Sequence, residues 1–275
     1  MDDLVSCQWL AANLRAADLV VLDASWHLPA ARRDARKDYA ARHLPGARFF
    51  DIEALSDPDA SSPHMLPSAD AFAAAMEALG VGSDDRIVVY DDSALRTSAR
   101  AWFMLRHYGA PQVAILDGGL QRWLAEGLPV TAEPPPERRA RFVAAPRPQE
   151  VVGKAELLRG QGSPVVDARS AARFAGAEPE PRPGLEAGHM PGSRNLPFAA
   201  LYQEDGRFKP PHELRAAFEA AGVDPSRPFV ATCGSGVTAN SLIFAARLLG
   251  NRDTRLYDGS WTEWGADPLT PKEKG

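Results

Sequence analysis

The sequence predicts an α/β protein built from two tandem domains, each a parallel β-sheet flanked by α-helices. Three observations lead to this fold class. The chain has 275 residues, which at about 150 residues per domain corresponds to roughly two domains. The second half repeats the first at a nearly constant offset, and within each half short apolar segments alternate with amphipathic ones.

The repeat is visible as four landmarks that recur in the same order. These are VVLDAS and VVDARS (Asp23 and Asp167), HLPGARFF and HMPGSRNLPF (His43 and His189), LGVGSDDRIVVYDD and AGVDPSRPFVATCG (Asp91 and Cys233), and DGGLQRW and DGSWTEW (Trp123 and Trp264). Between the copies, the proline-rich stretch 131–150 favours an extended connector. We therefore expect an N-terminal domain over 1–130, a linker over 131–150 and a C-terminal domain over 151–275.

Each copy has the same predicted order of elements. An apolar strand ends in aspartate, a His-x-Pro-Gly turn and an amphipathic helix follow, a second strand and helix come next, and a third strand ends in Asp-Gly. The helix after the second strand has apolar residues at i, i+3, i+4 and i+7 in both copies, from Ala101 to Tyr108 and from Leu242 to Leu249. Each helix is followed by a glycine, Gly109 or Gly250, as is typical of a helix end.

Composition excludes several classes of protein. Hydrophobic residues make up 45% of the chain, and the formal net charge is −5, so a nucleic-acid partner or an anionic membrane surface is not expected. No apolar run approaches the roughly 18 residues of a membrane span. The first residues, MDDLVSCQWLAANL, are acidic where a targeting peptide is basic, which predicts a cytoplasmic protein. The two cysteines, Cys7 and Cys233, form no CxxC or Cys/His cluster, so we expect neither metal nor cofactor.

The loop after the second strand of the C-terminal copy carries the clearest chemical signal. It reads Cys233, Gly234, Ser235, Gly236, Val237, Thr238 and runs directly into a helix. The two glycines let the backbone adopt positive φ and turn N–H groups inward, and the helix N-terminus adds partial positive charge. Both effects favour an anion, so we expect Cys233 to be a thiolate nucleophile with a lowered pKa rather than a buried packing residue.

These residues resemble the tandem rhodanese family and, within it, the 3-mercaptopyruvate sulfurtransferases. The resemblance covers nearly the whole chain: the loop CGSGVTA, the segment RFAGAEPEPRPGLEAGHMPGSRNLPF, FFDIEALSD, PHMLP and the closing YDGSWTEWG. It implies that Cys233 takes sulfur from 3-mercaptopyruvate, releases pyruvate and passes the sulfur from a persulfide to a thiol or cyanide. Thioredoxin is a candidate for the thiol acceptor.

The resemblance also implies roles for particular residues. Arg173 and Arg182 would hold the donor's carboxylate and carbonyl oxygens, a task suited to planar guanidinium groups. The loop residues Gly234, Gly236, Val237 and Thr238 would cradle the sulfur, and Ser235, His64 and Glu53 would form a relay. The family's acid is aspartate in some relatives, so the role of Glu53 is open.

The N-terminal copy is expected to be catalytically silent. Its equivalent strand continues from Asp91 through Asp92-Ser93-Ala94-Leu95-Arg96, with neither thiol nor glycine. Its expected task is to wall the cleft and supply Glu53 and His64.

Other functions remain open on the sequence. Thiosulfate sulfurtransferases share the fold but usually have basic residues where this chain has Gly234 and Ser235. A thiol phosphatase needs an arginine at the position of Ala239 to clamp phosphate oxygens. The string from Gly234 to Ala239 also fits a dinucleotide-binding pattern with Asp253 further on, although it comes late in its domain. A non-enzymatic sulfur carrier would have the same loop.

Overall fold

The structure is a computed structural model that describes residues 1–160 and 162–275. The chain forms two compact units, which we call the N-terminal unit and the C-terminal unit. The N-terminal unit comprises Met1–Ser56, Leu66–Arg147 and Glu204–Phe208, and the C-terminal unit comprises Asp57–Met65, Pro148–Gln203 and Lys209–Gly275. Two short segments are therefore grouped apart from their chain neighbours, and the contiguous boundaries expected from the sequence stay a prediction.

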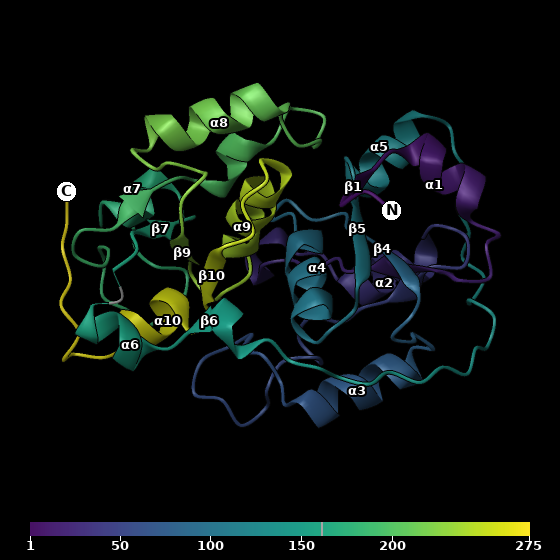
Figure 1. Cartoon of the computed structure of the whole chain (residues 1–275), viewed down its shortest axis with the longest axis horizontal. Coiled ribbons are helices and arrows are strands. Elements are labelled where there is room, and N and C mark those ends of the chain that lie inside the picture. Colours follow the sequence, from purple (N-terminus) through teal and green to yellow (C-terminus); the bar gives the residue numbers. More distant parts are fainter. Residues whose placement is uncertain (161) are drawn as a thin grey trace. The chain divides into compact units, whose positions relative to one another are not determined.

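The N-terminal unit contains a five-stranded, all-parallel sheet with strand order β1-β5-β4-β2-β3. Figure 1 labels β1, β5 and β4 of this sheet. Its strands are β1 (Leu4–Val5), β2 (Leu19–Asp23), β3 (Arg48–Phe49), β4 (Arg86–Tyr90) and β5 (Gln112–Leu116). Its helices are α1 (Cys7–Asn13), η1 (Pro29–Ala31), α2 (Ala35–Ala41), α3 (Ala69–Ala78), α4 (Ser98–His107) and α5 (Gly119–Ala125).

Both faces of this sheet are buried, as the continuous apolar strands predict. On one face, Val88 and Tyr90 of β4 belong to the cluster formed with α1 and α5. On the other face, aromatic packing includes Phe72 of α3, whose ring lies 4.2 Å from that of Tyr108 and 5.7 Å from that of Phe142. Because successive strand residues point to opposite faces, one strand serves both cores.

The C-terminal unit repeats this plan, with strand order β6-β10-β9-β7-β8 and all strands parallel. Its strands are β6 (Val151–Val152), β7 (Val165–Asp167), β8 (Arg194–Asn195), β9 (Phe229–Thr232) and β10 (Thr254–Tyr257). Its helices are η2 (Pro148–Glu150), α6 (Lys154–Arg159), α7 (Ala171–Phe174), η3 (Phe198–Leu201), α8 (Pro211–Ala220), α9 (Ala239–Leu248) and α10 (Ser260–Trp264). The predicted fold class is confirmed.

Pairing registers show that the two sheets are true structural repeats. Asp23 at the end of β2 pairs with Tyr90, and Asp167 at the end of β7 pairs with Thr232. The residues that follow Tyr90 and Thr232 are Asp91 and Cys233. Cys233 therefore leaves a central strand at the carboxyl edge of its sheet, where sites of parallel α/β folds form.

The proline-rich stretch has neither helix nor strand over 132–147 and is anchored to the N-terminal unit. Arg138 forms a two-pronged ion pair with Asp85, with both N–O distances 2.5 Å, and also donates to the carbonyl of Gly80. Further along, the Ala145 N–H donates to the carbonyl of Tyr108 at 2.9 Å. The guanidinium groups of Arg138 and Arg48, the second of which donates to the Pro136 carbonyl at 2.6 Å, thus hold an irregular segment in place together with several backbone bonds.

Cys7 and the two repeated histidines have structural environments. Cys7 is 1% exposed within the α1 core, and desolvation raises the pKa of its thiol to about 11, so it is not a nucleophile at neutral pH. His43 and His189 each stack on an aromatic ring, Tyr39 and Phe174 respectively, and each shares a hydrogen bond with the backbone carbonyl of that residue. These histidines tie the two His-x-Pro-Gly turns to α2 and α7.

One buried and one half-buried aspartate of the N-terminal unit make its stability depend on pH. Burial raises the pKa of Asp23 and of Asp117 to about 6. Because the folded state holds these protons more tightly than the unfolded chain, each contributes stability at acid pH that is lost as the pH rises from about 4 through about 6. Asp117→Asn keeps an acceptor for the Phe208 N–H. We expect it to raise the free energy of unfolding at pH 7.5 by roughly 1–2 kcal/mol while changing little at pH 4.

Urea unfolding followed by circular dichroism at both pH values measures this effect. Asp59→Asn, at an exposed position, is the control and should leave the pH dependence as it is in the unsubstituted protein. A wild-type slope in Asp117→Asn would contradict the assignment.

Candidate functional site

Hydrogen bonds to its backbone hold Cys233 in place at the end of β9. Its N–H donates to Ser260 Oγ at 3.2 Å, and its carbonyl accepts from the Trp261 N–H at 3.0 Å. The next carbonyl, that of Gly234, accepts from the Thr262 N–H at 2.8 Å. The cysteine is 2% exposed. The first turn of α10 thus fixes the position of Cys233 and binds the carbonyls of Cys233 and Gly234.

The loop that follows presents N–H groups rather than carbonyls. The buried Asn240 side chain donates to the carbonyls of Gly236 and Val237, at 2.6 and 2.9 Å. In the part of the chain that the structure describes, the backbone N–H groups of Gly234, Ser235, Val237 and Thr238 donate to no protein acceptor. Donors without a partner at the start of α9 can stabilise an anion. Sequence reasoning missed Asn240, whose position in the first turn of a predicted helix gives little signal.

The two loop glycines have different tasks, which corrects the expectation that both adopt positive φ. Gly236 does so, with φ 75°, and a Cβ there would lie 2.6 Å from the carbonyl oxygen of Asp258, so no other residue fits. Gly234 is not in the left-handed region. A Cβ at Gly234 would instead lie 3.0 Å from Nη2 of Arg173. Gly234 therefore makes room for a guanidinium group over the loop.

Arg173 is held beside the loop by a buried carboxylate. It lies on the one-turn helix α7, which Ser170 caps by accepting from the Arg173 N–H. Its Nη2 contacts Glu180 Oε2 at 2.5 Å and its Nε contacts Oε1 at 3.4 Å. The Glu180 side chain is 2% exposed and that of Arg173 is 24% exposed. The structure thus brings Arg173 and the Cys233 loop together, as predicted.

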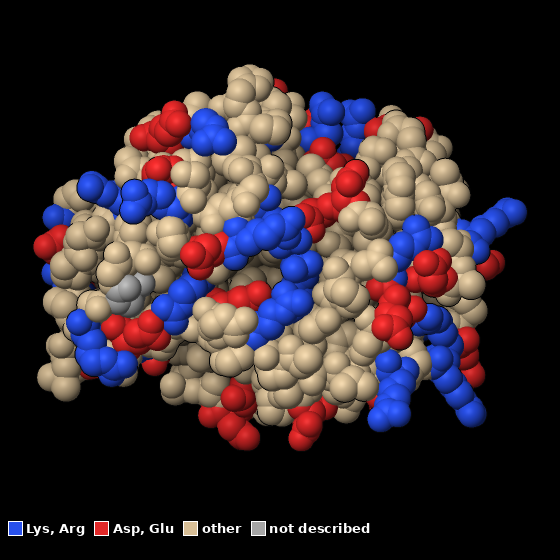
Figure 2. All heavy atoms as spheres, viewed as in Figure 1, with Lys and Arg blue, Asp and Glu red and all other residues tan. Residues whose placement is uncertain are grey.

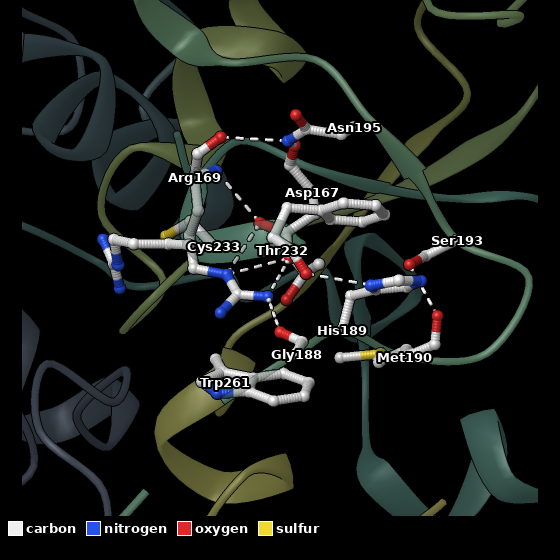
Figure 3. Close-up of polar contacts among 12 residues, drawn as sticks. Asp167, Arg169, Gly188, His189, Met190, Ser193, Asn195, Thr232, Cys233 and Trp261 are labelled. Atoms are coloured by element: carbon white, nitrogen blue, oxygen red, sulfur yellow. Dashed lines mark hydrogen bonds and ion pairs between the residues drawn. The ribbon is translucent and has the colours of Figure 1, made fainter. Parts of the chain in front are cut away.

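A second arginine, Arg169, holds this carboxylate in turn. Arg169 is fully buried, donates to both carboxylate oxygens of Asp167 at 2.7–3.1 Å, and donates through Nη1 to Glu180 Oε1 at 2.7 Å. Its guanidinium carbon lies 4.4 Å from the ring centroid of Trp261 (Figure 3). Trp261 is also the residue whose N–H binds the Cys233 carbonyl. One connected set of contacts therefore runs from the cysteine to Arg173.

The interpretation of the sequence missed this chain of contacts. Arg169, Glu180 and Trp261 were not singled out, although a signal existed: the repeat has Ser25 and Leu120 where the C-terminal copy has Arg169 and Trp261. Residues that differ between matched positions of the two copies are not required by the shared fold, which makes them candidates for a functional role.

His64 and Ser235 meet within the C-terminal unit. Nδ1 of His64 lies 2.8 Å from Ser235 Oγ, and the histidine is 1% exposed. Its φ is 62°, a left-handed conformation that few residues other than glycine adopt. Glu53 belongs to the N-terminal unit, where its carboxylate accepts from Trp26 Nε1 at 2.8 Å. Two members of the expected relay are in hydrogen-bond contact, and the part of Glu53 stays a prediction.

The remaining predicted site residues have the following places. Arg182 is half-buried between two prolines, and its role stays a prediction. Val237 is buried, and Thr238 is the residue that precedes α9. Among the described residues, no group of three His, Cys, Asp or Glu side chains is arranged to hold a metal ion.

Two general properties of the molecule bear on its partners. No helix in residues 1–160 or 162–275 combines the length and hydropathy needed to span a bilayer. Figure 2 shows basic and acidic side chains intermixed on the face drawn, in keeping with the small net charge.

Comparison with known proteins agrees with the site. The family model for the Rhodanese-like domain matches residues 6–126 and 153–267, one match for each half of the chain. The chain belongs to the rhodanese-like family. Over 270 residues it is 44% identical to the 3-mercaptopyruvate sulfurtransferase of Homo sapiens, covering 95% of this chain and 91% of that protein.

Two further relatives of this family are informative. The thiosulfate sulfurtransferase of Bos taurus is 44% identical over 274 residues, which cover 95% of this chain and 91% of that protein. The crystal structure of SseA from Escherichia coli, described as showing the fold of 3-mercaptopyruvate sulfotransferases, aligns with a TM-score of 0.86 at 38% identity, covering 95% of this chain and 99% of that one. The family therefore includes relatives named for two different sulfur donors.

We expect the loss of Glu180, which pairs with Arg173, to weaken donor binding. Glu180→Gln removes the charge that orients Arg173, so we expect the KM for the sulfur donor to rise about tenfold while kcat changes much less. Steady-state kinetics on the purified variant measures the split. Glu180→Asp, which keeps the charge, should recover part of the loss, and the exposed Glu178→Gln should behave as wild type. A fall in kcat at unchanged KM would argue against positioning.

Proposed function

We propose that the chain is a sulfurtransferase that moves the sulfur of 3-mercaptopyruvate through a persulfide on Cys233 to a thiol or cyanide acceptor and releases pyruvate. The observation that carries the proposal is the loop itself, in which the cysteine is followed by backbone N–H groups without protein acceptors, beside a guanidinium held by Glu180. This arrangement provides a nucleophile, an anion cradle and a carboxylate clamp in one place.

The first half-reaction transfers sulfur to the enzyme. The Cys233 thiolate attacks the donor's sulfur, a new S–S bond forms, and the donor's C–S bond breaks with its electron pair going to the enolate of pyruvate. The enolate then takes up on carbon the proton that the donor's thiol gives up, so the outer sulfur of the persulfide is left with the negative charge. The loop N–H groups stabilise the negative charge on the outer sulfur of the persulfide, while Arg173 and Arg182 hold the donor's oxygens.

The Ser235–His64 pair is suited to the leaving group. A hydroxyl supported by an imidazole can donate a hydrogen bond to the donor's carbonyl oxygen as that oxygen gains enolate character. Glu53 is the residue we propose as the acid of this relay. The left-handed backbone at His64 is the kind of costly local conformation that a functional role maintains.

The second half-reaction regenerates the thiolate. An acceptor thiolate attacks the outer sulfur, the S–S bond of the persulfide breaks, and Cys233 leaves as the thiolate. Two half-reactions that share one covalent intermediate predict ping-pong kinetics. Thioredoxin is the protein thiol we propose as acceptor and the cytoplasm is the compartment we propose, although one relative is mitochondrial by name.

The choice of donor follows from charge and space. Gly234 and Ser235 add no charge to the loop, which suits a monoanionic carboxylate better than the dianion thiosulfate. A side chain at position 234 would also meet Arg173 Nη2. The double variant Gly234→Arg, Ser235→Lys is therefore expected to lower kcat/KM for 3-mercaptopyruvate at least about tenfold and to shift preference toward thiosulfate.

Initial rates with both donors and one common acceptor test the proposal. The unsubstituted enzyme should favour 3-mercaptopyruvate, and mass spectrometry should show one added sulfur on Cys233 after incubation with the donor alone. Preference for thiosulfate would assign the chain to the other named activity of its family. Absence of any sulfur adduct with either donor would favour a non-enzymatic binding role.

A further inference from the structure

The N-terminal unit has a cavity of about 280 Å³ at the carboxyl edge of its sheet. Asp23, Ser25 and Leu120 line it together with charged side chains from α2, from the residues on either side of α2 and from the segment after β4. Nothing in the proposed sulfur transfer uses this cavity. It lies within one unit of the structure, so its shape is defined by that unit alone.

Backbone contacts identify this cavity as the counterpart of the Cys233 site. The N–H of Ala24 donates to the Tyr90 carbonyl at 2.8 Å, as the N–H of Ala168 donates to the Thr232 carbonyl at 2.8 Å. The N–H of Leu120 binds the Asp91 carbonyl at 3.0 Å, just as that of Trp261 binds the Cys233 carbonyl at 3.0 Å. Ser25 therefore stands at the position of Arg169, and Leu120 at that of Trp261.

These two replacements leave space where the C-terminal unit has a guanidinium group. In that unit, Arg169 fills the region between the carboxylate of Asp167 and the ring of Trp261 (Figure 3). In the N-terminal unit, serine and leucine are both shorter than the residues they replace, and the cavity opens between them. The matching carboxylate, Asp23, remains in place at 2% exposure.

Asp23 has Ser25 at the position where Asp167 has the cation Arg169. Among the residues that the structure describes, no arginine or lysine is paired with Asp23, whose Oδ1 accepts from the N–H and hydroxyl of Ser25 at 2.9 and 2.5 Å. Its repeat counterpart, Asp167, receives a full guanidinium. Desolvation accordingly raises the pKa of Asp23 to about 6, the mark of a buried carboxylate that lacks a compensating charge.

The rim of the cavity is also opposite in charge to the rim of the Cys233 site. Tyr39 stacks on His43 as Phe174 stacks on His189, so Asp38 of α2 corresponds to Arg173 of α7. Asp92 likewise takes the place of Gly234, because it follows Asp91 as Gly234 follows Cys233. Where the C-terminal unit places the guanidinium of Arg173 beside the loop, the N-terminal unit places carboxylates.

The two cations on the rim do not cancel these carboxylates. Arg33 bridges Asp92 and Asp38, at 2.6 and 2.8 Å, so its charge is used in the rim itself. Arg42, at the end of α2, is exposed. With Asp23 ionised, the lining holds three carboxylates and two guanidinium groups, which leaves one negative charge for a ligand to neutralise.

We propose that this cavity binds a small organic cation, whose guanidinium or primary ammonium group would lie against the Asp23 carboxylate with its apolar part over Leu120. The ligand would occupy the place that the Arg169 side chain fills in the other half of the chain. The N-terminal unit is then a cation-binding module rather than a silent copy of the catalytic one. This inference does not depend on the proposed sulfur transfer.

Titration of the full chain with N-methylguanidinium chloride tests the proposal, followed by backbone amide NMR at pH 7.5 and constant ionic strength. We expect saturable shifts at the amides of Ser25 and Leu120 with a Kd below about 10 mM. Methylammonium in a parallel titration decides between the two cation types. N-methylurea, which has nearly the same shape and no charge, is the matched control and should bind at least about tenfold more weakly.

Two variants complete the test. Asp23→Asn should weaken binding of N-methylguanidinium at least about tenfold. Ser25→Arg should place a guanidinium where Arg169 has one, fill the cavity and abolish binding. If Asp23→Asn does not fold, binding to Ser25→Arg, shown to be folded by its NMR spectrum, decides the test. The proposal is overturned by linear, unsaturated shifts up to 50 mM probe, by equal binding of N-methylurea, or by unchanged binding in folded Ser25→Arg.

Discussion

Cys233→Ser is expected to abolish sulfur transfer, with kcat reduced by at least about 10³-fold and the fold unchanged. A serine hydroxyl fits the volume of the thiol, and the hydrogen bonds with Ser260 and Trp261 hold this residue by its backbone N–H and carbonyl. The hydroxyl does not ionise at neutral pH and forms no persulfide. Pyruvate release from 3-mercaptopyruvate, together with circular dichroism of the variant, provides the measurement.

The other cysteine provides the control for this experiment. Cys7→Ala removes a thiol that is buried in the α1 core, so activity per folded molecule should stay at the wild-type level even though the protein loses some stability. Wild-type turnover in Cys233→Ser would remove the basis of the proposed mechanism.

Arg173→Lys is expected to produce the second largest effect, a fall of about 10²-fold in kcat/KM for 3-mercaptopyruvate. Lysine keeps the positive charge but loses the planar fork, which in the structure is divided between Glu180 and the space over Gly234. A lysine ammonium group can pair with Glu180 or occupy the space over Gly234, but it cannot do both at once. Steady-state kinetics with donor concentration varied at saturating acceptor measures the change.

Arg194→Lys, at an exposed position on β8, is the matched control and should leave kcat/KM within about twofold of wild type. Equal kinetics for Arg173→Lys and wild type would show that charge alone suffices, and the orienting role of Glu180 would then lose its support.

The architecture could be predicted from the sequence because the same chain pattern occurs twice. Strands ending in Asp23 and Asp167, and helices followed by Gly109 and Gly250, are local signals that each copy confirms in the other. Cys233 was found for a related reason, since it breaks the repeat at a strand end. Predictions of this kind depend on backbone geometry, which short sequence patterns specify well.

The side-chain network could not be predicted with the same certainty, because it joins residues that are distant in sequence. Nothing local to Glu180 indicates that it is 2% exposed between two guanidinium groups. The Asn240 amide and the left-handed backbone of His64 are likewise consequences of tertiary packing. The expectation of positive φ at both loop glycines was wrong because a glycine can also be required by a neighbouring side chain, as at Gly234.

The hydrogen bonds behind the Cys233 loop have a consequence for how such an enzyme can diversify. The N–H groups of Trp261 and Thr262 hold the loop by its carbonyls, without using the side chains of Ser235, Val237 or Thr238. The curvature of the loop is therefore set by the sheet, by α10 and by the glycine at position 236, and not by the side chains at positions 235, 237 and 238. Substitutions at the rim of the Cys233 loop can therefore change selectivity for the sulfur donor while the sulfur chemistry is preserved. One scaffold can in this way give enzymes with different donors.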